Sequence, residues 1–338
     1  MEYPSNRYFG DLEVVQEFYG AMPTGVAISS TGRIFVCFPE WGDQVDYAIG
    51  EIKNEELVPY LNIPSLCSIQ SVYVDEYDIL WILDTGSLNF LQPDLKKTKL
   101  IAVDLQTDEI KKTYFFTSDV VTKTSYLNDV RVDYSKNVPY AYITDSSASG
   151  IGAIIVLNLN TGRFFRRLDS DVSTSAESNF LAKVEGRYFI NEDGSSVTLA
   201  SDGIALDAKQ NKLYYCPLSS RNLYAVNTDD LVNTSLSDIE LSKRVESIVQ
   251  KGASDGMICD KYGNLFFGDY ENNAICVFSE NKIKTILYSP FIIWPDTLAI
   301  HDNYLYIIVN QLNRQARYNK GKDLRQLPYI LIRSQLQQ

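Results

Sequence analysis

The sequence has very little histidine. His301 is the one histidine in 338 residues, so the chain can form neither a histidine-rich zinc site nor a Ser-His-Asp triad that does without His301. His301 lies in His301-Asp302-Asn303, a predicted hairpin turn, which favours a structural or solvated role over catalysis. Any catalysis must therefore come from carboxylates, from a bound metal that acts as a Lewis acid, or from a tyrosine.

Other common signals are missing as well. No run of about 18 apolar residues occurs, so no membrane-spanning helix is expected. Residues 1–4 lack the basic start and apolar stretch of a signal peptide, so none is expected in this chain. No glycine-rich phosphate loop is present, and no nucleotide cofactor is expected. The five cysteines have no metal-ligand spacing, and four of them lie in apolar strand patterns that predict buried free thiols: Cys37, Cys216, Cys259 and Cys276.

Basic residues are too few to balance the acidic ones. The 31 Lys and Arg residues face 43 Asp and Glu residues, which gives a net charge of −12. Such a chain repels a phosphate backbone, so nucleic acid is not expected as a partner. The same acidity favours cations and amines among small-molecule ligands, although most of the surface charge needs no explanation beyond solubility.

One short phrase recurs along the chain. It begins with a small or polar residue, continues with Asp, Asn or Gly in most copies, and ends in an alternating apolar run. A polar turn and a second apolar strand follow most copies, and a spacing of roughly 40 to 75 residues is typical of propeller blades. The leading polar residues of the six copies are Thr24, Gln70, Asn128, Asp202, Asp255 and Asp296.

Six copies predict an all-β protein, a six-bladed β-propeller with four antiparallel strands per blade. No linker rich in Pro, Gly or Ser interrupts the strand patterns, so residues 1–338 are expected to form a single domain. Residues 12–18 precede the first copy and residues 329–333 follow the last. We expect the N-terminal strand to complete the last blade, because closing the ring removes open sheet edges. Residues 230–249 are expected to carry a short helix.

The inner strands of a propeller converge on a central channel, so the six leading residues should meet at one mouth. We call these six residues the channel ring. A turn before a strand explains any one copy equally well, but six copies in phase favour a shared polar face. Buried carboxylates are costly, so the ring should hold a metal ion or a protonated amine, or be satisfied by water and backbone amides. Trp294 is expected either to wall the mouth, which would suit an aromatic amine, or to pack between blades.

Segments spread over nearly the whole chain, in order, carry a family resemblance: 12–15, 32–41, 72–75, 80–86, 127–129, 142–146, 202–206 and 294–298. They resemble the yellow and major royal jelly protein family, most specifically in Leu83-Asp84-Thr85-Gly86 and Trp294-Pro295-Asp296-Thr297. The family fold implied is a six-bladed propeller, which agrees with the repeat count. The resemblance also implies a secreted or periplasmic protein, and the family's roles include dopachrome conversion, nutrition and capture of biogenic amines. Tyr77 stands where insect members tend to carry a cysteine.

A more distant resemblance concerns the ring. Residues 252–257 and 127–129 look like the calcium-binding strands of gluconolactonase, paraoxonase and diisopropyl-fluorophosphatase propellers. The resemblance implies a calcium ion, Ca²⁺, held by Asn128, Asp202 and Asp255, with Thr24 where those enzymes have Glu. Calcium prefers six to eight oxygen ligands with several carboxylates, and the two aspartates supply two charges.

Two functions follow. The first is a binding protein that holds a small polar or amine-bearing aromatic ligand at the channel mouth through Thr24, Gln70, Trp294 and Asp296. The second is a calcium-dependent lactonase or esterase that uses the inner Asn and Asp residues. A dopachrome-converting isomerase is a further enzymatic possibility that the family implies. The sequence assigns no catalytic residue.

Overall fold

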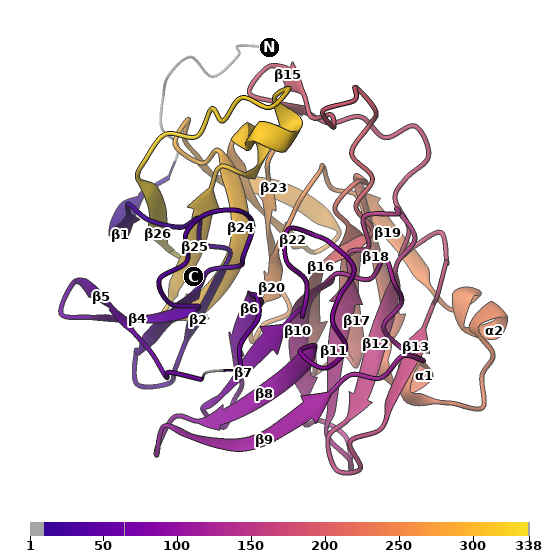
Figure 1. The fold of residues 1–338 in the computed structure, drawn as a ribbon. Coiled ribbons are helices and arrows are strands. Elements are labelled where there is room, and N and C mark those ends of the chain that lie inside the picture. The colour runs from indigo at the N-terminus through magenta and orange to yellow at the C-terminus, as the bar shows by residue number, and fades with distance from the viewer. Residues whose placement is uncertain (1–9, 64, 337–338) are drawn as a thin grey trace.

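The computed structural model describes residues 10–63 and 65–336, which form six four-stranded antiparallel sheets around a common centre. Figure 1 shows β6, β10, β16 and β20 near the middle of the molecule and β1, β5 and β9 at its periphery. The predicted six-bladed all-β propeller with four antiparallel strands per blade is confirmed. Second strands such as β7 (ILWILD) are buried on both faces, because each blade packs between two others, and this explains their continuous apolar runs.

Each blade is numbered in chain order, and its strands are given from the channel outward. Blade 1 contains β2 (Gly25–Ile28), β3 (Ile34–Cys37), β4 (Ile49–Lys53) and β5 (Glu56–Pro59); blade 2 contains β6 (Ile69–Val74), β7 (Ile79–Asp84), β8 (Lys99–Asp104) and β9 (Glu109–Phe115). Blade 3 contains β10 (Leu127–Asp133), β11 (Tyr140–Asp145), β12 (Ala153–Asn158) and β13 (Phe164–Arg167); blade 4 contains β16 (Ser201–Asp207), β17 (Lys212–Pro217), β18 (Asn222–Asn227) and β19 (Glu246–Gln250). Blade 5 contains β20 (Met257–Cys259), β21 (Leu265–Asp269), β22 (Ala274–Ser279) and β23 (Lys282–Tyr288); blade 6 contains β24 (Trp294–His301), β25 (Tyr304–Asn310), β26 (Tyr329–Gln335) and β1 (Glu13–Phe18).

The N-terminal strand closes the circle of six blades. β1 pairs antiparallel with β26 as the outermost strand of blade 6, and Glu13 lies opposite Arg333. An ion pair of 2.7 Å between these two side chains reinforces the pairing. The predicted closure is therefore confirmed, and its physical reason is that β1 covers the edge that β26 would otherwise expose.

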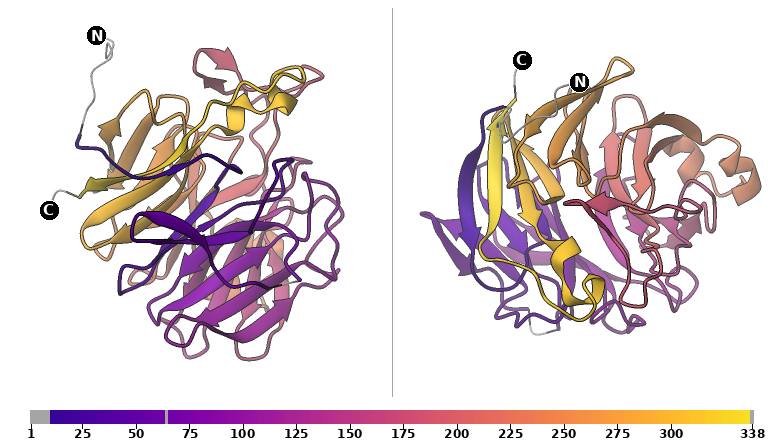
Figure 2. Two further views of the ribbon diagram at one scale, coloured as in Figure 1. Left: turned by 60° about the vertical axis from the view of Figure 1, so that its left-hand side comes forward. Right: turned by 90° about the horizontal axis from the view of Figure 1, so that it is seen from above.

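Two groups of elements lie outside the blades. The hairpin of β14 (Lys183–Val184) and β15 (Arg187–Tyr188) and the 3-10 helices η1 (Leu312–Arg314) and η2 (Ala316–Tyr318) project beyond the sheets on the same side, as Figure 2 shows. The helices α1 (Thr228–Val232) and α2 (Asp238–Ser242) lie in the connection where one short helix was expected. No helix within residues 10–63 and 65–336 has the length and apolar character to cross a membrane.

Glycine follows the ring residue where neighbouring inner strands come closest. A Cβ atom at Gly203 would collide with the carbonyl oxygen of Asp255, and one at Gly256 would collide with that of Asp296. The backbone N–H of Gly256 also donates a hydrogen bond of 2.8 Å to the Asp296 carbonyl oxygen. The Asp-Gly pairs of the repeated phrase therefore allow blades to approach backbone to backbone.

We expect Gly256→Ala to lower the free energy of unfolding by about 1–3 kcal/mol, because the added methyl group overpacks this contact. Urea unfolding followed by circular dichroism measures the loss. Gly20→Ala is the matched control, since a Cβ atom at Gly20 has nothing within 4 Å. Equal stability of the two variants would contradict the steric explanation.

Candidate functional site

The channel ring is formed where the inner strands depart from regular pairing. Register shifts occur between Ile69 and Ser71, Leu127 and Val130, Ser201 and Ile204, and Pro295 and Leu298. These β-bulges contain Gln70, Asn128, Asp202 and Asp296, and a bulge turns a side chain away from its regular direction. Thr24 and Asp255 lie just before the first residues of β2 and β20.

A chain of hydrogen bonds joins three of the ring residues. Gln70 Nε2 donates to Asn128 Oδ1 at 3.0 Å, and Asn128 Nδ2 donates to Asp202 Oδ2 at 2.5 Å. Ser146, the residue after β11, also contacts Asp202 Oδ2 through its hydroxyl, at 2.7 Å. The ring predicted from the repeats thus brings residues from blades 2, 3 and 4 into direct contact.

The other two aspartates have their own protein donors. Trp294 Nε1 donates to Asp255 Oδ2 at 2.7 Å, and Asn310 Nδ2 donates to Asp296 Oδ2 at 2.6 Å. All three ring aspartates are less than a tenth exposed. Such burial of acidic groups is costly unless they are neutral or meet a cation.

Burial raises the pKa values of all three ring aspartates. Burial raises the pKa of Asp202 well above its usual range, and the charge of Asp255 adds to the shift. The same two causes, in the same order, raise the pKa of Asp296. Burial raises the pKa of Asp255 to about 6, against the hydrogen bonds with Asp202 and Trp294, which lower it. Without a cation, burial therefore favours the protonated form of these carboxyl groups.

A small cavity of about 20 Å³ lies against the ring. Five ring residues line it (Gln70, Asn128, Asp202, Asp255 and Asp296), together with Ser146 and an apolar cover of Trp41, Phe90, Tyr126, Leu199, Leu218 and Leu312. No described residue that lines this cavity is basic. The volume is enough for one water molecule or one monatomic ion, so the enclosed space in this conformation is ion-sized.

Three aromatic side chains close the cavity, and we call them the lid: Trp41, Phe90 and Tyr126. Phe90 stacks on Trp41 with ring centroids 4.9 Å apart and on Tyr126 at 4.5 Å. The Tyr126 hydroxyl donates to Gln70 Oε1 at 2.9 Å and accepts from Trp41 Nε1 at 2.7 Å. The guanidinium of Arg317 lies 4.7 Å from the Phe90 ring centroid. The lid is thereby tied to the ring.

Two of the predicted site residues lie beside the cavity without lining it. Thr24 is fully buried, and its hydroxyl donates to the Gln70 carbonyl oxygen at 2.9 Å. Trp294 is also fully buried, where it stacks on Tyr270 at 4.2 Å and reaches Asp255. A ligand role for either residue stays a prediction, and the contacts seen here are structural.

The sequence places Phe90 and Tyr126 in or beside blade connections near the ring, where an aromatic wall over carboxylates would suit an aromatic amine, and both line the cavity. Sequence reasoning missed Ser146, Asn310 and Trp41. Ser146 and Asn310 lie at the ends of second strands, where an acidic or amide residue recurs at Asp84, Asp145, Asp269 and Asn310. This recurrence at the ends of the second strands keeps the same spacing as the repeated phrase, and it could have pointed to Ser146 and Asn310. The lid residues come from loops of different blades, and no local pattern indicates that they meet.

The donor chemistry of the ring can be compared with what a metal needs. Asn128, Asp202, Asp255 and Asp296 offer oxygen atoms, the donor type that Ca²⁺ prefers. Within the part of the chain that the structure describes, however, no three His, Cys, Asp or Glu side chains are already grouped around a metal position. The donors suit calcium, but a metal would require the carboxylates to rearrange.

With this geometry in place, the chain can be compared with known proteins. Residues 67–337 match the family model described as "Major royal jelly protein". The chain belongs to this family. Major royal jelly protein 7 of Apis mellifera is 24% identical over 330 residues, and the match covers 88% of this chain and 69% of that protein. Major royal jelly protein 5 of Apis mellifera is 26% identical over 260 residues, covering 75% of this chain and 39% of that protein.

Solved structures share the family's propeller fold. A gluconolactonase from Xanthomonas campestris matches with a TM-score of 0.58 and 12% identity, over 96% of this chain and 89% of that one. A calcium-binding regucalcin from Agrobacterium tumefaciens matches with a TM-score of 0.59 and 13% identity, over 97% and 96%. At such low identity these likenesses show the fold alone.

Proposed function

We propose that this major royal jelly family member binds a small ligand with a positively charged group, which Asp202, Asp255 and Asp296 receive at the channel mouth. The observation that carries the proposal is the convergence of three buried carboxyl groups on one cavity whose described lining contains no basic side chain. A bound cation would let these groups ionise and would offset the cost of their burial.

The lid favours a ligand in which an amino group is attached to an aromatic ring system. Trp41, Phe90 and Tyr126 are the ring systems that attract an organic cation and stack on its aromatic part. The cavity of about 20 Å³ accepts only the charged end while the lid is closed. Phe90 has a φ of 60° and its neighbour Asn89 a φ of 51°, a conformation that a bulky side chain rarely adopts. We infer that this loop moves when the ligand's aromatic part enters.

Dopamine is therefore expected to stabilise the protein against heat and to bind in calorimetry at pH 7.5. Stabilisation of about 2.7 kcal/mol is expected when the free amine is at 100 times its dissociation constant. Asp202→Asn and Asp255→Asn should each abolish the effect, because the carboxylates receive the ammonium group. Asp119→Asn, at an exposed position, is the matched control. The proposal fails if both ring variants bind dopamine as tightly as the unaltered protein.

A calcium-dependent hydrolase is the second candidate, and the oxygen donor set of the ring favours it. The calcium would act as a Lewis acid on an ester or lactone carbonyl. Addition of CaCl₂ should then raise the melting temperature, and EGTA should reverse the rise and stop hydrolysis of a simple lactone. Melting that responds to neither reagent removes this candidate. Secretion, which the family resemblance implies, stays a prediction.

A further inference from the structure

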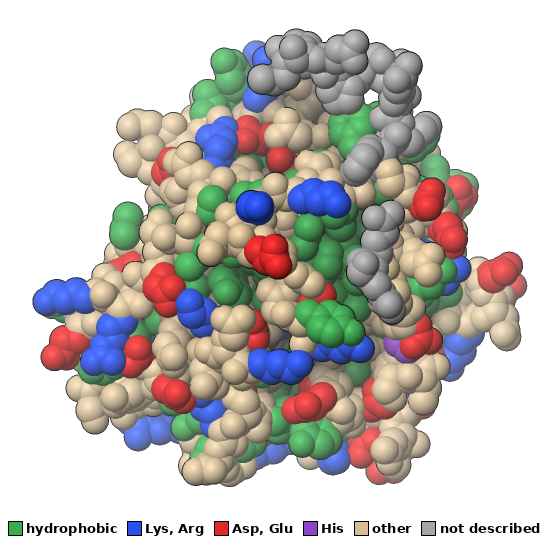
Figure 3. Space-filling model, turned by 180° about the vertical axis from the view of Figure 1, so that it is seen from behind, with side chains coloured by type: hydrophobic (Ala, Val, Ile, Leu, Met, Phe, Trp, Pro, Cys, Tyr) green, Lys and Arg blue, Asp and Glu red, His purple; other side chains and the backbone are tan. Residues whose placement is uncertain are grey.

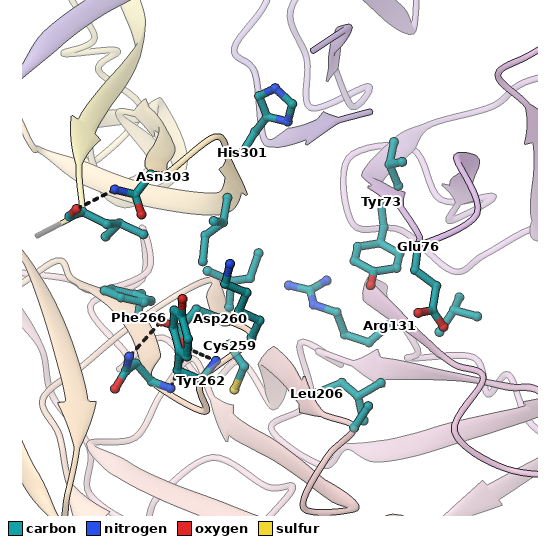
Figure 4. A pocket seen from close by; sticks show the side chains of 18 of the residues that line it. Tyr73, Glu76, Arg131, Leu206, Cys259, Asp260, Tyr262, Phe266, His301 and Asn303 are labelled. Carbon is teal, nitrogen blue, oxygen red and sulfur yellow. Dashed lines mark hydrogen bonds between the residues drawn. The ribbon is translucent and has the colours of Figure 1, made fainter. Parts of the chain in front are cut away.

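A second and much larger cavity, of about 960 Å³, opens at the opposite mouth of the channel. It lies at the far ends of the inner strands, next to Val74, Val132, Leu206, Cys259 and Ile300. It shares no lining residue with the cavity at the channel ring. We call it the far pocket, and Figure 4 shows it from close by.

One part of the far pocket's wall suits the apolar body of a molecule. Aromatic rings and aliphatic side chains from five blades face the pocket, among them Tyr73, Tyr134, Phe266, Ile258, Leu206 and Ile300. The volume lies at the upper end of the range of about 300–1,000 Å³ that small-molecule sites occupy. Size and lining therefore fit a compact organic ligand better than an ion.

Arg131 provides a polar anchor in these walls. Its side chain is 4% exposed, and Figure 4 shows its guanidinium directed toward the interior of the pocket. The guanidinium donates to Asp129 Oδ1 at 2.9 Å and to the carbonyl oxygens of Val130 at 2.7 Å and Met257 at 2.8 Å. Its Nε is buried and has no hydrogen-bond partner among the described residues. An unpaired buried donor of this kind is costly and indicates a missing acceptor.

Tyr73 adds a second polar group beside Arg131. The Arg131 guanidinium carbon lies 5.2 Å from the Tyr73 ring centroid, and both residues also line a smaller cavity of about 60 Å³ that reaches Val26, Val72 and Leu298. The Tyr73 hydroxyl forms no hydrogen bond within residues 10–63 and 65–336. The Arg131 guanidinium and the Tyr73 hydroxyl, which can both donate hydrogen bonds, therefore lie close together where the far pocket meets this smaller cavity.

The charges around the far pocket argue against an anion. Asp129 already forms an ion pair with Arg131, so the charge of the guanidinium is neutralised within the protein. Three acidic residues, Glu76, Asp260 and Asp302, also line the pocket. Apart from Arg131, Lys261 is the lysine or arginine among the described lining residues. Figure 3 shows acidic and basic side chains interspersed over the rear face of the molecule. A neutral ligand avoids repulsion by these carboxylates.

We propose that the far pocket binds a neutral, largely apolar molecule whose carbonyl oxygen accepts hydrogen bonds from Arg131 and Tyr73. The carbonyl oxygen satisfies donors that the protein leaves open, and the apolar body fills the space between the tyrosines and aliphatic walls. This site is separate from the amine site at the channel ring and does not depend on it.

The probe is prodan, a neutral naphthyl ketone whose emission shifts to the blue in apolar surroundings. We expect saturable binding with a blue shift by the unaltered protein. Tyr73→Phe should weaken binding roughly five-fold by removing one donor. Tyr262→Phe, at an exposed tyrosine of the rim, is the matched control and should bind as before. The double variant Arg131→Met with Asp129→Asn should weaken binding more than ten-fold, because it removes the guanidinium donors. Changing Asp129 at the same time leaves no unpaired buried carboxylate.

Ala208→Trp keeps the test decisive if the double variant does not fold. Ala208 is exposed at the rim of the far pocket, so a tryptophan there is tolerated and narrows the entrance. It should reduce prodan affinity, whereas Asp202→Asn at the other mouth should leave it unchanged. The proposal is overturned if the unaltered protein binds no prodan, if Tyr73→Phe and Ala208→Trp bind it as tightly as the unaltered protein, or if the anionic dye ANS binds more tightly than prodan.

Discussion

Trp294→Ala is expected to lower the free energy of unfolding by roughly 4–8 kcal/mol. Trp294 is fully buried and is among the largest buried side chains of the chain, and truncating a buried tryptophan costs about 3–5 kcal/mol. The change also leaves Asp255 without the indole N–H that reaches its Oδ2, which adds about 1–3 kcal/mol for an unpaired buried group. Guanidinium unfolding followed by tyrosine fluorescence and circular dichroism measures the loss.

Two further variants separate packing from hydrogen bonding. Trp294→Phe retains an aromatic ring near Tyr270 and removes the donor, so it should cost less than Trp294→Ala. Adding Asp255→Asn to Trp294→Phe should recover part of that cost, because a neutral amide tolerates the loss of its partner better than a carboxylate. Tyr188→Ala, at a tyrosine that is 61% exposed, should change stability by about 0.5 kcal/mol or less. A loss for Trp294→Ala no larger than this control would contradict the structural role.

Asp255→Asn is expected to stabilise the cation-free protein increasingly as the pH rises from 4 to 8, by about 3 kcal/mol in total. Burial raises the pKa of Asp255 to about 6 in the folded protein, whereas an unfolded aspartate has a pKa of about 3.9. The folded state binds the proton more tightly, so this group's contribution is fully present below about pH 4 and is lost as the pH passes through 6. One pKa unit corresponds to about 1.4 kcal/mol.

The measurement is urea unfolding in EDTA-containing buffer at several pH values, with the difference between Asp255→Asn and the unaltered protein as the readout. Taking the difference cancels the contribution of carboxylates whose pKa is lowered in the folded protein, such as Glu185 beside Arg314. The stability that these groups provide is lost as the pH falls. The pKa values of Asp202 and Asp296 are raised in the same direction, so Asp202→Asn should follow the same trend. A difference that does not change with pH would show that the ring does not retain protons.

The repeats predict the fold because their signals are local. A polar residue, a turn and two apolar strands recur within each copy, and the number of copies fixes the number of blades. The same regularity places Gln70, Asn128 and Asp202 at one mouth, where the structure joins them by hydrogen bonds. Residues 12–18 are predicted to complete the last blade for a more general reason, because that pairing removes an open sheet edge.

What the sequence could not show depends on contacts between blades. The β-bulges at Gln70 and Asn128 are register shifts against a partner strand, and such shifts leave no periodic signal. Trp294 faces Asp255 across a boundary between blades 5 and 6, and either strand pattern alone leaves the direction of the indole open. The far pocket escaped sequence reasoning because Arg131 occupies an ordinary alternating position of β10.

The pairing of β1 with β26 has a consequence for biosynthesis. Glu13 and Arg333 face each other across the last blade, so the first strand leaves the ribosome more than 300 residues before its partner. At about 5–20 residues per second, β1 waits roughly 15–60 seconds with an unpaired edge. The propeller therefore closes only after translation of β26, and until then the charged side chains of Glu13 and Glu17 oppose pairing of this edge with another chain.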